Sequence, residues 1–357
     1  MKYLYFLLTG DCNLRCRYCF QEQVPESGTT KEVIDALAVY CRENEIGRVE
    51  LFGGEPLMDR DLFRYTVTQL ENSCPDIRIS MITNGTLVDS PTMAFLKEHE
   101  ISILLSLDGT RETHNRMRGG FDDIVRWVTH FDNPSRIRVA LQAAQVKGLY
   151  DNIRYVWDLG FAGGVFVNVI QNYGWYSEDD IAAFEPEYEK ALLGMLRGEG
   201  VLDCANKLFD AINQSFQRNM NCGICSVGLA ADWKGRLYPC QRAGELGEEF
   251  IIGDLWKGID RAKENEIRSS ILNSVSSSRS ASDYLVAGHC PVSLYKHHHS
   301  FNGEWSEGFC RIIETKAKLV AKHYYQMRDY YVRKPWDPHY GQSSQPNGPL
   351  PVLVAGE

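Results

Sequence analysis

Three cysteines near the amino terminus carry the clearest chemical signal in this chain. Cys12, Cys16 and Cys19 stand in the short segment GDCNLRCRYCF. Thiolates are the usual ligands of iron–sulfur clusters, which commonly take four. Three thiolates on a four-iron cluster leave one iron open to a small molecule, much as catalytic zinc keeps one open position. A zinc knuckle is the alternative, but zinc normally takes a fourth Cys or His at similar spacing and none follows closely.

A second group of cysteines lies in the last third of the chain. Its members are Cys222, Cys225, Cys240, Cys290 and Cys310. The chain has eleven cysteines in 357 residues, whereas disulfide scaffolds are typical of short secreted chains. We therefore interpret both groups as metal ligands in a reducing compartment. Cys41, Cys74 and Cys204 stand apart and are interpreted as small buried hydrophobic residues.

The composition is that of an ordinary globular protein, with 44% hydrophobic and 24% charged residues. The net charge of −9 argues against a general binder of nucleic acids or membrane surfaces. The apolar run at residues 3–8 is far too short to span a bilayer. A cytoplasmic protein is expected.

Short apolar runs alternate with longer amphipathic stretches over the first 200 residues. The predicted strands are 3–8, 49–52, 77–82, 101–107, 137–143 and 165–170. The predicted helices are 31–44, 61–72, 90–99, 149–159 and 177–194. Six such units predict an α/β fold with a parallel sheet. Since a closed TIM barrel takes eight units, we expect a partial (β/α)6 TIM-type barrel.

Four successive predicted strands end in small or polar residues. They are the cysteine loop, Gly53-Gly54-Glu55-Pro56, Thr83-Asn84-Gly85 and Ser106-Leu107-Asp108-Gly109. Parallel strands end at one edge of the sheet, where barrels of this kind carry their chemistry. All four motifs are therefore expected on one rim.

In this order, the motifs resemble those of the radical S-adenosylmethionine (SAM) superfamily. The cysteine triad, with Tyr18 before its last cysteine, resembles the superfamily's signature, and Gly53 to Pro56 resembles its GGEP motif. The segment from His114 to Gly119 resembles the HDxxR-G element, with Asn in place of the acidic residue. The resemblance covers roughly residues 1–200. It implies that a reduced 4Fe-4S cluster cleaves SAM to methionine and a 5′-deoxyadenosyl radical, which takes a hydrogen atom from the substrate.

The same resemblance assigns residues to SAM. The expected contacts are Tyr18, Gly53, Gly54, Glu55, Pro56, Thr83, Asn84, Ser106, Asp108 and Arg118. Glu55 and the backbone around it hold the amino group, and Arg118 supplies a cation for the carboxylate. Ser106 and Asp108 correspond to contacts with the ribose and carboxylate, and Tyr18 lies near the adenine. No protein group beyond the cluster and SAM is assigned a catalytic role.

The segment from Cys225 to Cys240 resembles the opening of SPASM, an auxiliary-cluster domain found in many peptide-modifying members of the superfamily. The SPASM pattern continues with four closely spaced cysteines and one more. This chain departs there, because Ser293, His299 and Gly303 stand at expected cysteine positions. A reduced, twitch-like domain with a single auxiliary cluster is the closest description.

Five cysteines are too few for two auxiliary 4Fe-4S clusters. The predicted ligands of one such cluster are Cys222, Cys225 and Cys240, with Cys290 or Cys310 as the fourth. A zinc site made by the same thiolates is the alternative.

The predicted domains are a radical SAM partial barrel at 1–200, an auxiliary iron–sulfur domain at 201–331 and a flexible Pro/Gly-rich tail at 332–357. Within the second domain, residues 312–331 are expected to form a helix, and the serine-rich stretch 269–282 a loop or weak helix. Residues 297–299, all histidine, are interpreted as a solvated loop that could join a metal site.

The leading hypothesis for function is maturation of a ribosomally synthesised peptide by cross-linking or another oxidative modification. In the sulfatase-maturing branch an acidic base follows the cysteine that matches Cys240. Here Gln241 and Arg242 follow it, which counts against sulfatase-type oxidation. A radical dehydrogenase acting on a small metabolite and a non-catalytic iron–sulfur or zinc protein are the alternatives.

Partners follow from these hypotheses. The chain starts directly at the first strand, so a peptide's leader is expected to bind the core or a separate leader-binding protein. Reduction of the cluster implies an electron donor such as flavodoxin or ferredoxin. An epimerase would need a thiol hydrogen donor, for which Cys204 is a weak candidate.

Overall fold

The computed structural model describes residues 2–21, 27–128, 137–160, 164–171, 174–202, 228–276, 291–299 and 306–333. Six strands and seven α-helices occupy the described residues up to 202. The strands are β1 (Lys2–Thr9), β2 (Ile46–Gly53), β3 (Arg78–Thr83), β4 (Ser102–Ser106), β5 (Ile137–Gln142) and β6 (Val165–Asn168). The helices are α1 (Lys31–Glu43), α2 (Arg60–Ser73), α3 (Ser90–Glu98), α4 (Arg111–Met117), α5 (Phe121–Val128), α6 (Leu149–Asp158) and α7 (Glu178–Arg197), with the short 3-10 helix η1 (Pro56–Met58) after β2.

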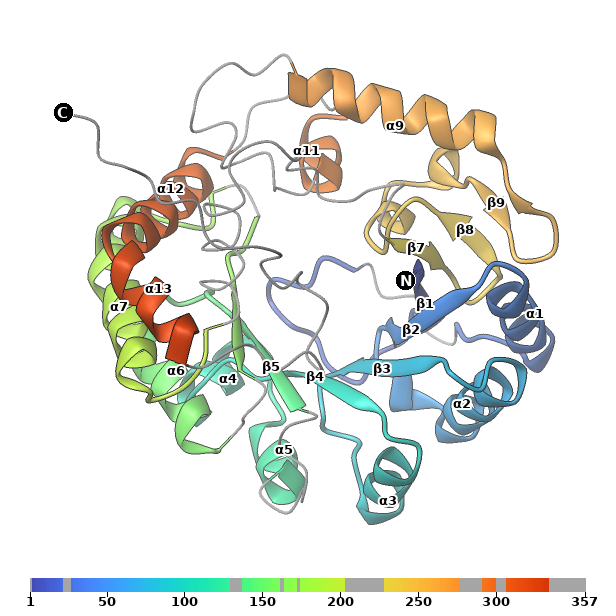
Figure 1. Ribbon diagram of the computed structural model, residues 1–357, viewed down its shortest axis with the longest axis horizontal. Coiled ribbons are helices and arrows are strands. Elements are labelled where there is room, and N and C mark those ends of the chain that lie inside the picture. The colour runs from blue at the N-terminus through green and yellow to red at the C-terminus, as the bar shows by residue number, and fades with distance from the viewer. Residues whose placement is uncertain are drawn as a thin grey trace.

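Each of these strands pairs in parallel with the next, which confirms the predicted α/β class. Figure 1 shows them curving into part of a ring, with α1, α2, α3 and α5 on its outside. The carboxyl ends of β1 to β4 therefore lie side by side on one rim. This is the partial barrel that the sequence predicts.

The sheet continues on the other side of β1, which the sequence did not predict. Strand β7 (Gly228–Ala231) runs parallel to β1, and β8 (Arg236–Tyr238), β9 (Gly253–Asp254) and β10 (Gly258–Ile259) follow as antiparallel neighbours. The strand order is β10-β9-β8-β7-β1-β2-β3-β4-β5-β6. One sheet thus carries strands from both predicted domains, and the division near residue 200 stays a prediction.

Helix α1 illustrates how the sequence produces the outer layer. Thr30 caps its start by accepting a hydrogen bond from the backbone N–H of Val33 at 3.4 Å. Its buried face consists of Val33, Ile34, Leu37, Ala38, Tyr40 and Cys41. Burying a large apolar side chain contributes roughly 1.5–3 kcal/mol, so this face fixes the helix on the sheet. The interpretation of Cys41 as a small buried residue is confirmed.

The last third is more helical than predicted. Its helices are α9 (Arg261–Ser276), α11 (Pro291–His298), α12 (Glu307–Lys322) and α13 (Tyr324–Arg333). The prediction of a single helix at 312–331 is wrong, because α12 ends before His323 and α13 begins after it. The ring nitrogens of His323 lie 2.7 Å from Glu189 on α7 and 2.7 Å from Gln326, contacts that the sequence pattern does not reveal.

The serine-rich stretch, expected as a loop or weak helix, is confirmed as a helix over its described part, whereas the loop expected at residues 297–299 is wrong for the first two histidines. The serine-rich stretch is helical as far as Ser276, and the rest of it lies outside the described residues. His297 and His298 belong to the end of α11 and not to a loop. Cys204 and the tail from residue 334 onward lie outside the described residues.

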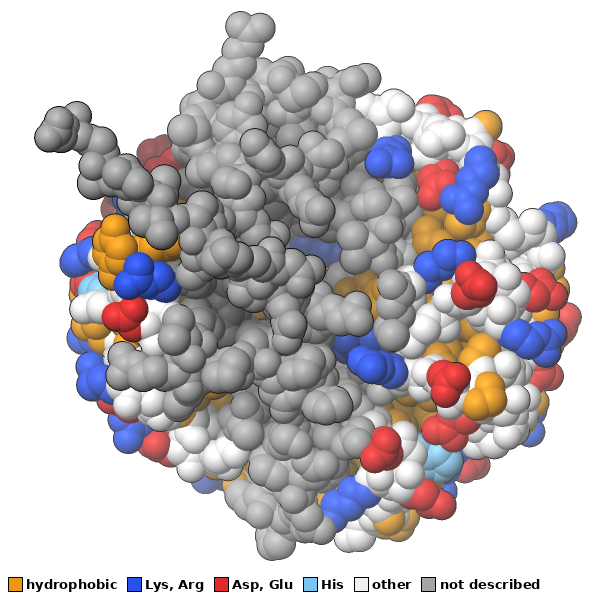
Figure 2. All heavy atoms as spheres, viewed as in Figure 1, with side chains coloured by type: hydrophobic (Ala, Val, Ile, Leu, Met, Phe, Trp, Pro, Cys, Tyr) orange, Lys and Arg blue, Asp and Glu red, His pale blue; other side chains and the backbone are white. Residues whose placement is uncertain are grey.

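The described surface mixes charges of both signs. Figure 2 shows Lys, Arg, Asp and Glu side chains interspersed over the side of the ring that carries α1, α2 and β9. Among the described helices, none is both long and apolar enough to cross a membrane.

Candidate functional site

The two glycines after β2 let the chain approach the cysteine loop closely. The N–H of Gly54 donates to the carbonyl of Thr9 at 2.8 Å, and the N–H of Glu55 donates to the carbonyl of Asp11 at 2.9 Å. A Cβ atom on Gly54 would lie 1.9 Å from the Asp11 oxygen. Gly53 has a φ of +135°, and a Cβ atom there would lie 2.2 Å from the Thr9 carbonyl oxygen. The Gly-Gly pair is therefore required to fasten the start of the cysteine loop to the end of β2.

The cysteine loop is held by its own backbone and by α4. The N–H of Cys19 donates to the carbonyl of Cys16 at 3.1 Å, and the N–H of Arg17 donates to the carbonyl of Met117 at 3.0 Å. Cys12 and Cys16 are half-buried, and Cys19 is exposed. Burial raises the pKa of Cys12 to about 11 and also raises the pKa of Cys16. Thiolates at these positions thus need a cationic partner, as a metal centre provides.

Among the described residues, no three His, Cys, Asp or Glu side chains are arranged as ligands of one metal ion. The three thiolates of a cluster bind separate irons, so a cluster does not need such an arrangement.

Asn84 follows β3 and turns its amide toward the loop. Its Oδ1 accepts hydrogen bonds from the backbone N–H of Thr86 at 2.9 Å and from the Thr86 hydroxyl at 2.7 Å. Its Nδ2 donates to Oδ1 of Asn13 at 2.9 Å and lies 3.8 Å from Sγ of Cys12. The expected cofactor residue Asn84 is thus in contact with a predicted metal ligand.

Glu55 is fully buried between the ends of β2 and β3. Its carboxylate accepts hydrogen bonds from the Thr83 hydroxyl at 2.7 Å, the N–H of Asn84 at 2.7 Å and the N–H of Leu57 at 3.2 Å. Burial raises the pKa of this carboxyl to about 7, and the three hydrogen bonds oppose that rise. The side chain therefore joins two strand ends beside the cysteine loop, where Pro56 begins η1.

Asp108, just after β4, is the centre of a second buried network. Its carboxylate accepts hydrogen bonds from Nε of Arg118 at 3.0 Å, from the N–H of Gln142 at 3.0 Å and from the Tyr18 hydroxyl. Arg118 lies over the Tyr18 ring, 5.0 Å from its centroid, and its Nη1 is 3.8 Å from Sγ of Cys16. The structure thus joins residues of β4, the α4 segment and the cysteine loop. Ser106 is buried at the end of β4.

His114 explains why the segment after β4 holds its shape. It is fully buried, its Nδ1 accepts from the N–H of Asp108 at 3.2 Å, and its Nε2 donates to the carbonyl of Gly119 at 3.0 Å. Burial lowers its pKa to about 4, so the ring is neutral at physiological pH. At the departure from the motif, Oδ1 of Asn115 accepts a hydrogen bond from the N–H of Phe121 at 3.1 Å.

A small apolar cluster, separate from the main core, lines the other side of the loop. Tyr18, Met117 and Ile170 are its buried members, and Trp175 packs edge-on against Tyr18 at 6.2 Å between ring centroids. The indole N–H of Trp175 donates to the carbonyl of Ala144 at 3.1 Å. Trp175 was missed in the sequence because it lies between β6 and α7, away from the strand-end motifs.

The predicted auxiliary ligands are only partly within the described residues. Cys240 follows β8 and packs half-buried against the main core, while Cys310 lies on α12, which packs against α7. Figure 1 shows β8 and α12 on opposite sides of the ring, so the structure does not bring these two cysteines together. Cys222, Cys225 and Cys290 lie outside the described residues.

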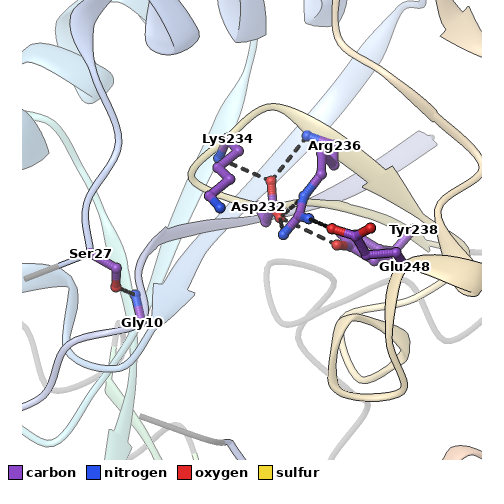
Figure 3. A network of polar contacts seen from close by, with 7 residues as sticks. All are labelled: Gly10, Ser27, Asp232, Lys234, Arg236, Tyr238 and Glu248. Atoms are coloured by element: carbon purple, nitrogen blue, oxygen red, sulfur yellow. Dashed lines mark hydrogen bonds and ion pairs between the residues drawn. The ribbon is translucent and has the colours of Figure 1, made fainter. Parts of the chain in front are cut away.

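The hairpin before Cys240 is shaped by Asp232, as Figure 3 shows. The carboxylate of Asp232 accepts hydrogen bonds from the N–H of Lys234 at 2.9 Å and the Tyr238 hydroxyl at 3.3 Å. It also pairs with Nη2 of Arg236 at 2.6 Å. These contacts fix the tight turn that directs β8 back toward Cys240.

Comparisons with known proteins agree with this geometry. The model of the Radical SAM superfamily matches residues 6–132. A cysteine-type anaerobic sulfatase-maturating enzyme of Clostridium perfringens is 30% identical over 288 residues, which are 70% of this chain and 74% of that protein. The antilisterial bacteriocin subtilosin biosynthesis protein AlbA of Bacillus subtilis is 24% identical over 306 residues, 81% of this chain and 65% of AlbA.

The fold agrees as well. The solved structure of native anSMEcpe with bound AdoMet and Cp18Cys peptide aligns with a TM-score of 0.74 at 18% identity, covering 93% of this chain and 100% of that one. The chain therefore belongs to the radical SAM superfamily, whose members bind a 4Fe-4S cluster and SAM.

Proposed function

We propose that this protein is a radical SAM peptide maturase. In this proposal it generates a 5′-deoxyadenosyl radical, abstracts hydrogen from a ribosomally synthesised peptide and leaves a cross-link or another oxidative modification. The observation that carries the proposal is the gathering of the cysteine loop, the Gly-Gly pair, Asn84 and Arg118 on one rim. When bound, the cluster and SAM supply the electron transfer and the radical.

The residues on the rim have separate tasks in this proposal. Cys12, Cys16 and Cys19 hold three irons and leave the fourth open. Arg118 presents a cation for the SAM carboxylate, and Asp108 keeps that cation in place through the contact at 3.0 Å. Tyr18 gives the adenine an aromatic neighbour. The Gly-Gly pair holds the end of β2 against the loop, so that backbone groups there meet the SAM amino group.

A peptide substrate is supported by the relatives. One is a sulfatase-maturating enzyme, one is a bacteriocin biosynthesis protein, and anSMEcpe has been solved with a bound peptide. Sulfatase-type oxidation is not favoured. In that branch an acidic base follows the cysteine that matches Cys240, whereas Gln241 and Arg242 follow it here, and the guanidinium of Arg242 lies 4.7 Å from the Phe20 ring centroid and 3.2 Å from Oε1 of Gln171. A guanidinium does not act as a base at neutral pH.

We also propose one auxiliary 4Fe-4S cluster on Cys222, Cys225 and Cys240, with Cys290 as the fourth ligand in preference to Cys310. Cys290 directly precedes α11, whose Lys296 donates to the carbonyl of Phe20 at 3.0 Å, next to the cysteine loop. Cys310 lies on α12, across the ring from β8. The variants Cys290→Ala and Cys310→Ala test this choice when the iron content of each is measured. Only Cys290→Ala should lower the iron content.

The cofactor half of the proposal is tested with anaerobically reconstituted protein, SAM and a strong reductant. The triple variant Cys12→Ala/Cys16→Ala/Cys19→Ala should lose about four irons per chain and all 5′-deoxyadenosine formation. The control variant Cys74→Ala should keep both, because Cys74 lies outside the loop at the end of α2. Unchanged iron and turnover in the triple variant would overturn the proposal.

The substrate half needs a peptide encoded beside the gene, incubated with the active enzyme and analysed by mass spectrometry. The expected result is a loss of mass that corresponds to hydrogen atoms and depends on SAM. Formation of 5′-deoxyadenosine without any change in such peptides would count against a peptide substrate and favour a small metabolite.

A further inference from the structure

Two side-chain N–H groups point at thiols of the cysteine loop from different parts of the rim. Nδ2 of Asn84, after β3, lies 3.8 Å from Sγ of Cys12. Nη1 of Arg118, after α4, lies 3.8 Å from Sγ of Cys16. The backbone N–H of Leu14 also donates to Sγ of Cys12 at 3.5 Å. Two of the three loop thiols therefore receive N–H donors that the loop itself does not supply.

The orientation of the Asn84 amide is fixed by its neighbours. Its Oδ1 already accepts from the N–H and the hydroxyl of Thr86, so the amino group must face the other way. That amino group carries two hydrogens. One is donated to Oδ1 of Asn13 at 2.9 Å, and the other is left for Sγ of Cys12.

The guanidinium of Arg118 is fixed in the same way. Its Nε is held by the Asp108 carboxylate at 3.0 Å, and its plane lies over the Tyr18 ring. The side chain of Arg118 is 9% exposed and that of Asp108 is 0% exposed, so water screens this charge weakly. Nη1 is thereby kept beside Sγ of Cys16 without needing a ligand to order it.

We propose that Asn84 and Arg118 are positioning residues that raise the reduction potential of the cluster on Cys12, Cys16 and Cys19. This inference rests on the proposed function. Reduction adds one negative charge to the cluster and its thiolates, and N–H donors and a nearby cation stabilise that added charge. Hydrogen bonds to the sulfurs are among the factors that set cluster potentials. The same two residues thus make the cluster easier for an electron donor to reduce.

The test is a reductive titration of the reconstituted, SAM-free protein followed by electron paramagnetic resonance. The spectrum of the triple cysteine variant is subtracted to remove the auxiliary cluster. At the parent's midpoint potential, Arg118→Gln should lower the ratio of reduced to oxidised cluster about tenfold, a shift of about 59 mV to more negative potential for a one-electron couple. Asn84→Leu should shift it in the same direction by a smaller amount.

The matched control is Arg116→Gln. Arg116 lies two residues before Arg118, at the end of α4, but is exposed and bonded to Glu112 and Gln145, so its loss should leave the potential unchanged. Midpoint potentials of the Arg118 and Asn84 variants that equal the control would overturn the inference. Iron content is measured in every variant. The triple cysteine variant tests the proposed function, and the midpoint potentials test the inference. Loss of the loop cluster in that variant together with unchanged potentials would therefore overturn the inference alone.

A second measurement detects the contact directly. Pulsed paramagnetic resonance on the reduced Arg15→Lys protein, grown with arginine labelled with ¹⁵N in the guanidinium only, should show a ¹⁵N coupling to the loop cluster. Arg15 is replaced because its guanidinium bonds the carbonyl of Cys12. Within the part of the chain that the structure describes, Arg118 is the arginine whose guanidinium contacts a loop thiol, so absence of this coupling would overturn its part of the inference.

Discussion

The substitution Gly54→Ala isolates a purely steric requirement of the site. A Cβ atom there would lie 1.9 Å from the carbonyl oxygen of Asp11, and that atom is backbone, which does not rotate away. To reach ordinary van der Waals contact, the oxygen must withdraw by about 1.5 Å. Such a movement breaks the hydrogen bonds from Gly54 to Thr9 and from Glu55 to Asp11, now at 2.8 and 2.9 Å.

The size of the effect follows from these two bonds. A backbone hydrogen bond contributes about 0.5–1.5 kcal/mol net, so their joint loss costs about 1–3 kcal/mol of unfolding free energy. The larger effect should be on function, because the cysteine loop then separates from the end of β2. We expect SAM affinity to fall at least tenfold, while iron binding by the loop is affected less.

Gly28→Ala provides the matched control. No atom lies within 4 Å of a Cβ at Gly28, which stands shortly before α1. Urea unfolding and equilibrium dialysis with labelled SAM, both done anaerobically, measure the two quantities. If the variants at Gly54 and Gly28 behaved alike in both assays, the steric argument for the Gly-Gly pair would be refuted.

Three further predictions concern buried ionisable groups. The pKa of Glu55 is raised from 4.5 to about 7, so between these pH values the folded protein binds more protons than the unfolded chain. As the pH rises from 4.5 to 7, the parent protein should therefore lose up to roughly 3 kcal/mol of unfolding free energy relative to Glu55→Gln. Urea unfolding at a series of pH values measures this, and the same pH dependence in both proteins would contradict the prediction. The pKa of His114 is lowered from 6.5 to about 4, so the neutral ring stabilises the fold fully above pH 6.5, and this stabilisation is lost as the pH falls toward 4. In His114→Gln, the unfolding free energy should fall by up to roughly 3 kcal/mol less over that pH range, measured by the same unfolding series. Asp108→Asn leaves Arg118 without its buried counter-charge and should cost about 3 kcal/mol in denaturant unfolding, whereas Asp179→Asn, which breaks an exposed ion pair with Lys147, should cost less than about 1 kcal/mol.

The positions of the rim motifs could be predicted because two strong regularities coincide. Apolar runs of strand length identify β1 to β6, and right-handed parallel connections place all their carboxyl ends at one edge. Strand β5, for example, begins at Ile137 as predicted. The residues that follow such strands must then be neighbours, whatever the details of the helices between them.

The extension of the sheet could not be predicted in this way. Strands β7 to β10 have between two and four residues, too few to show an alternating pattern, and β7 begins with Gly228. Its parallel pairing with β1 is a contact between residues far apart in the sequence. Similarly, His323, where α12 ends, contacts Glu189 on α7, and no local pattern of α12 reveals that contact.

The structure brings the residues predicted for the site together, while their roles toward SAM stay predictions. Glu55 and Asp108 were expected to contact SAM, but a motif does not show whether a side chain faces the ligand or the protein. In the structure both carboxylates are almost fully buried and take their hydrogen bonds from protein groups. Some of those donors, such as the N–H of Gln142 on β5, belong to strands that the motif does not include.

The positions of these two carboxylates affect the electrostatics of the cysteine loop. A carboxylate facing an anionic cluster would oppose its reduction, whereas a carboxylate behind an N–H donor orients that donor. Glu55 accepts from the backbone N–H of Asn84, whose side-chain amide faces Cys12, and Asp108 accepts from Nε of Arg118, whose Nη1 faces Cys16. Each carboxylate is thus separated from a thiol by one residue that donates to both. In our proposal, the two carboxylates orient these N–H donors toward the loop thiols, and the donors make the cluster on the loop easier to reduce.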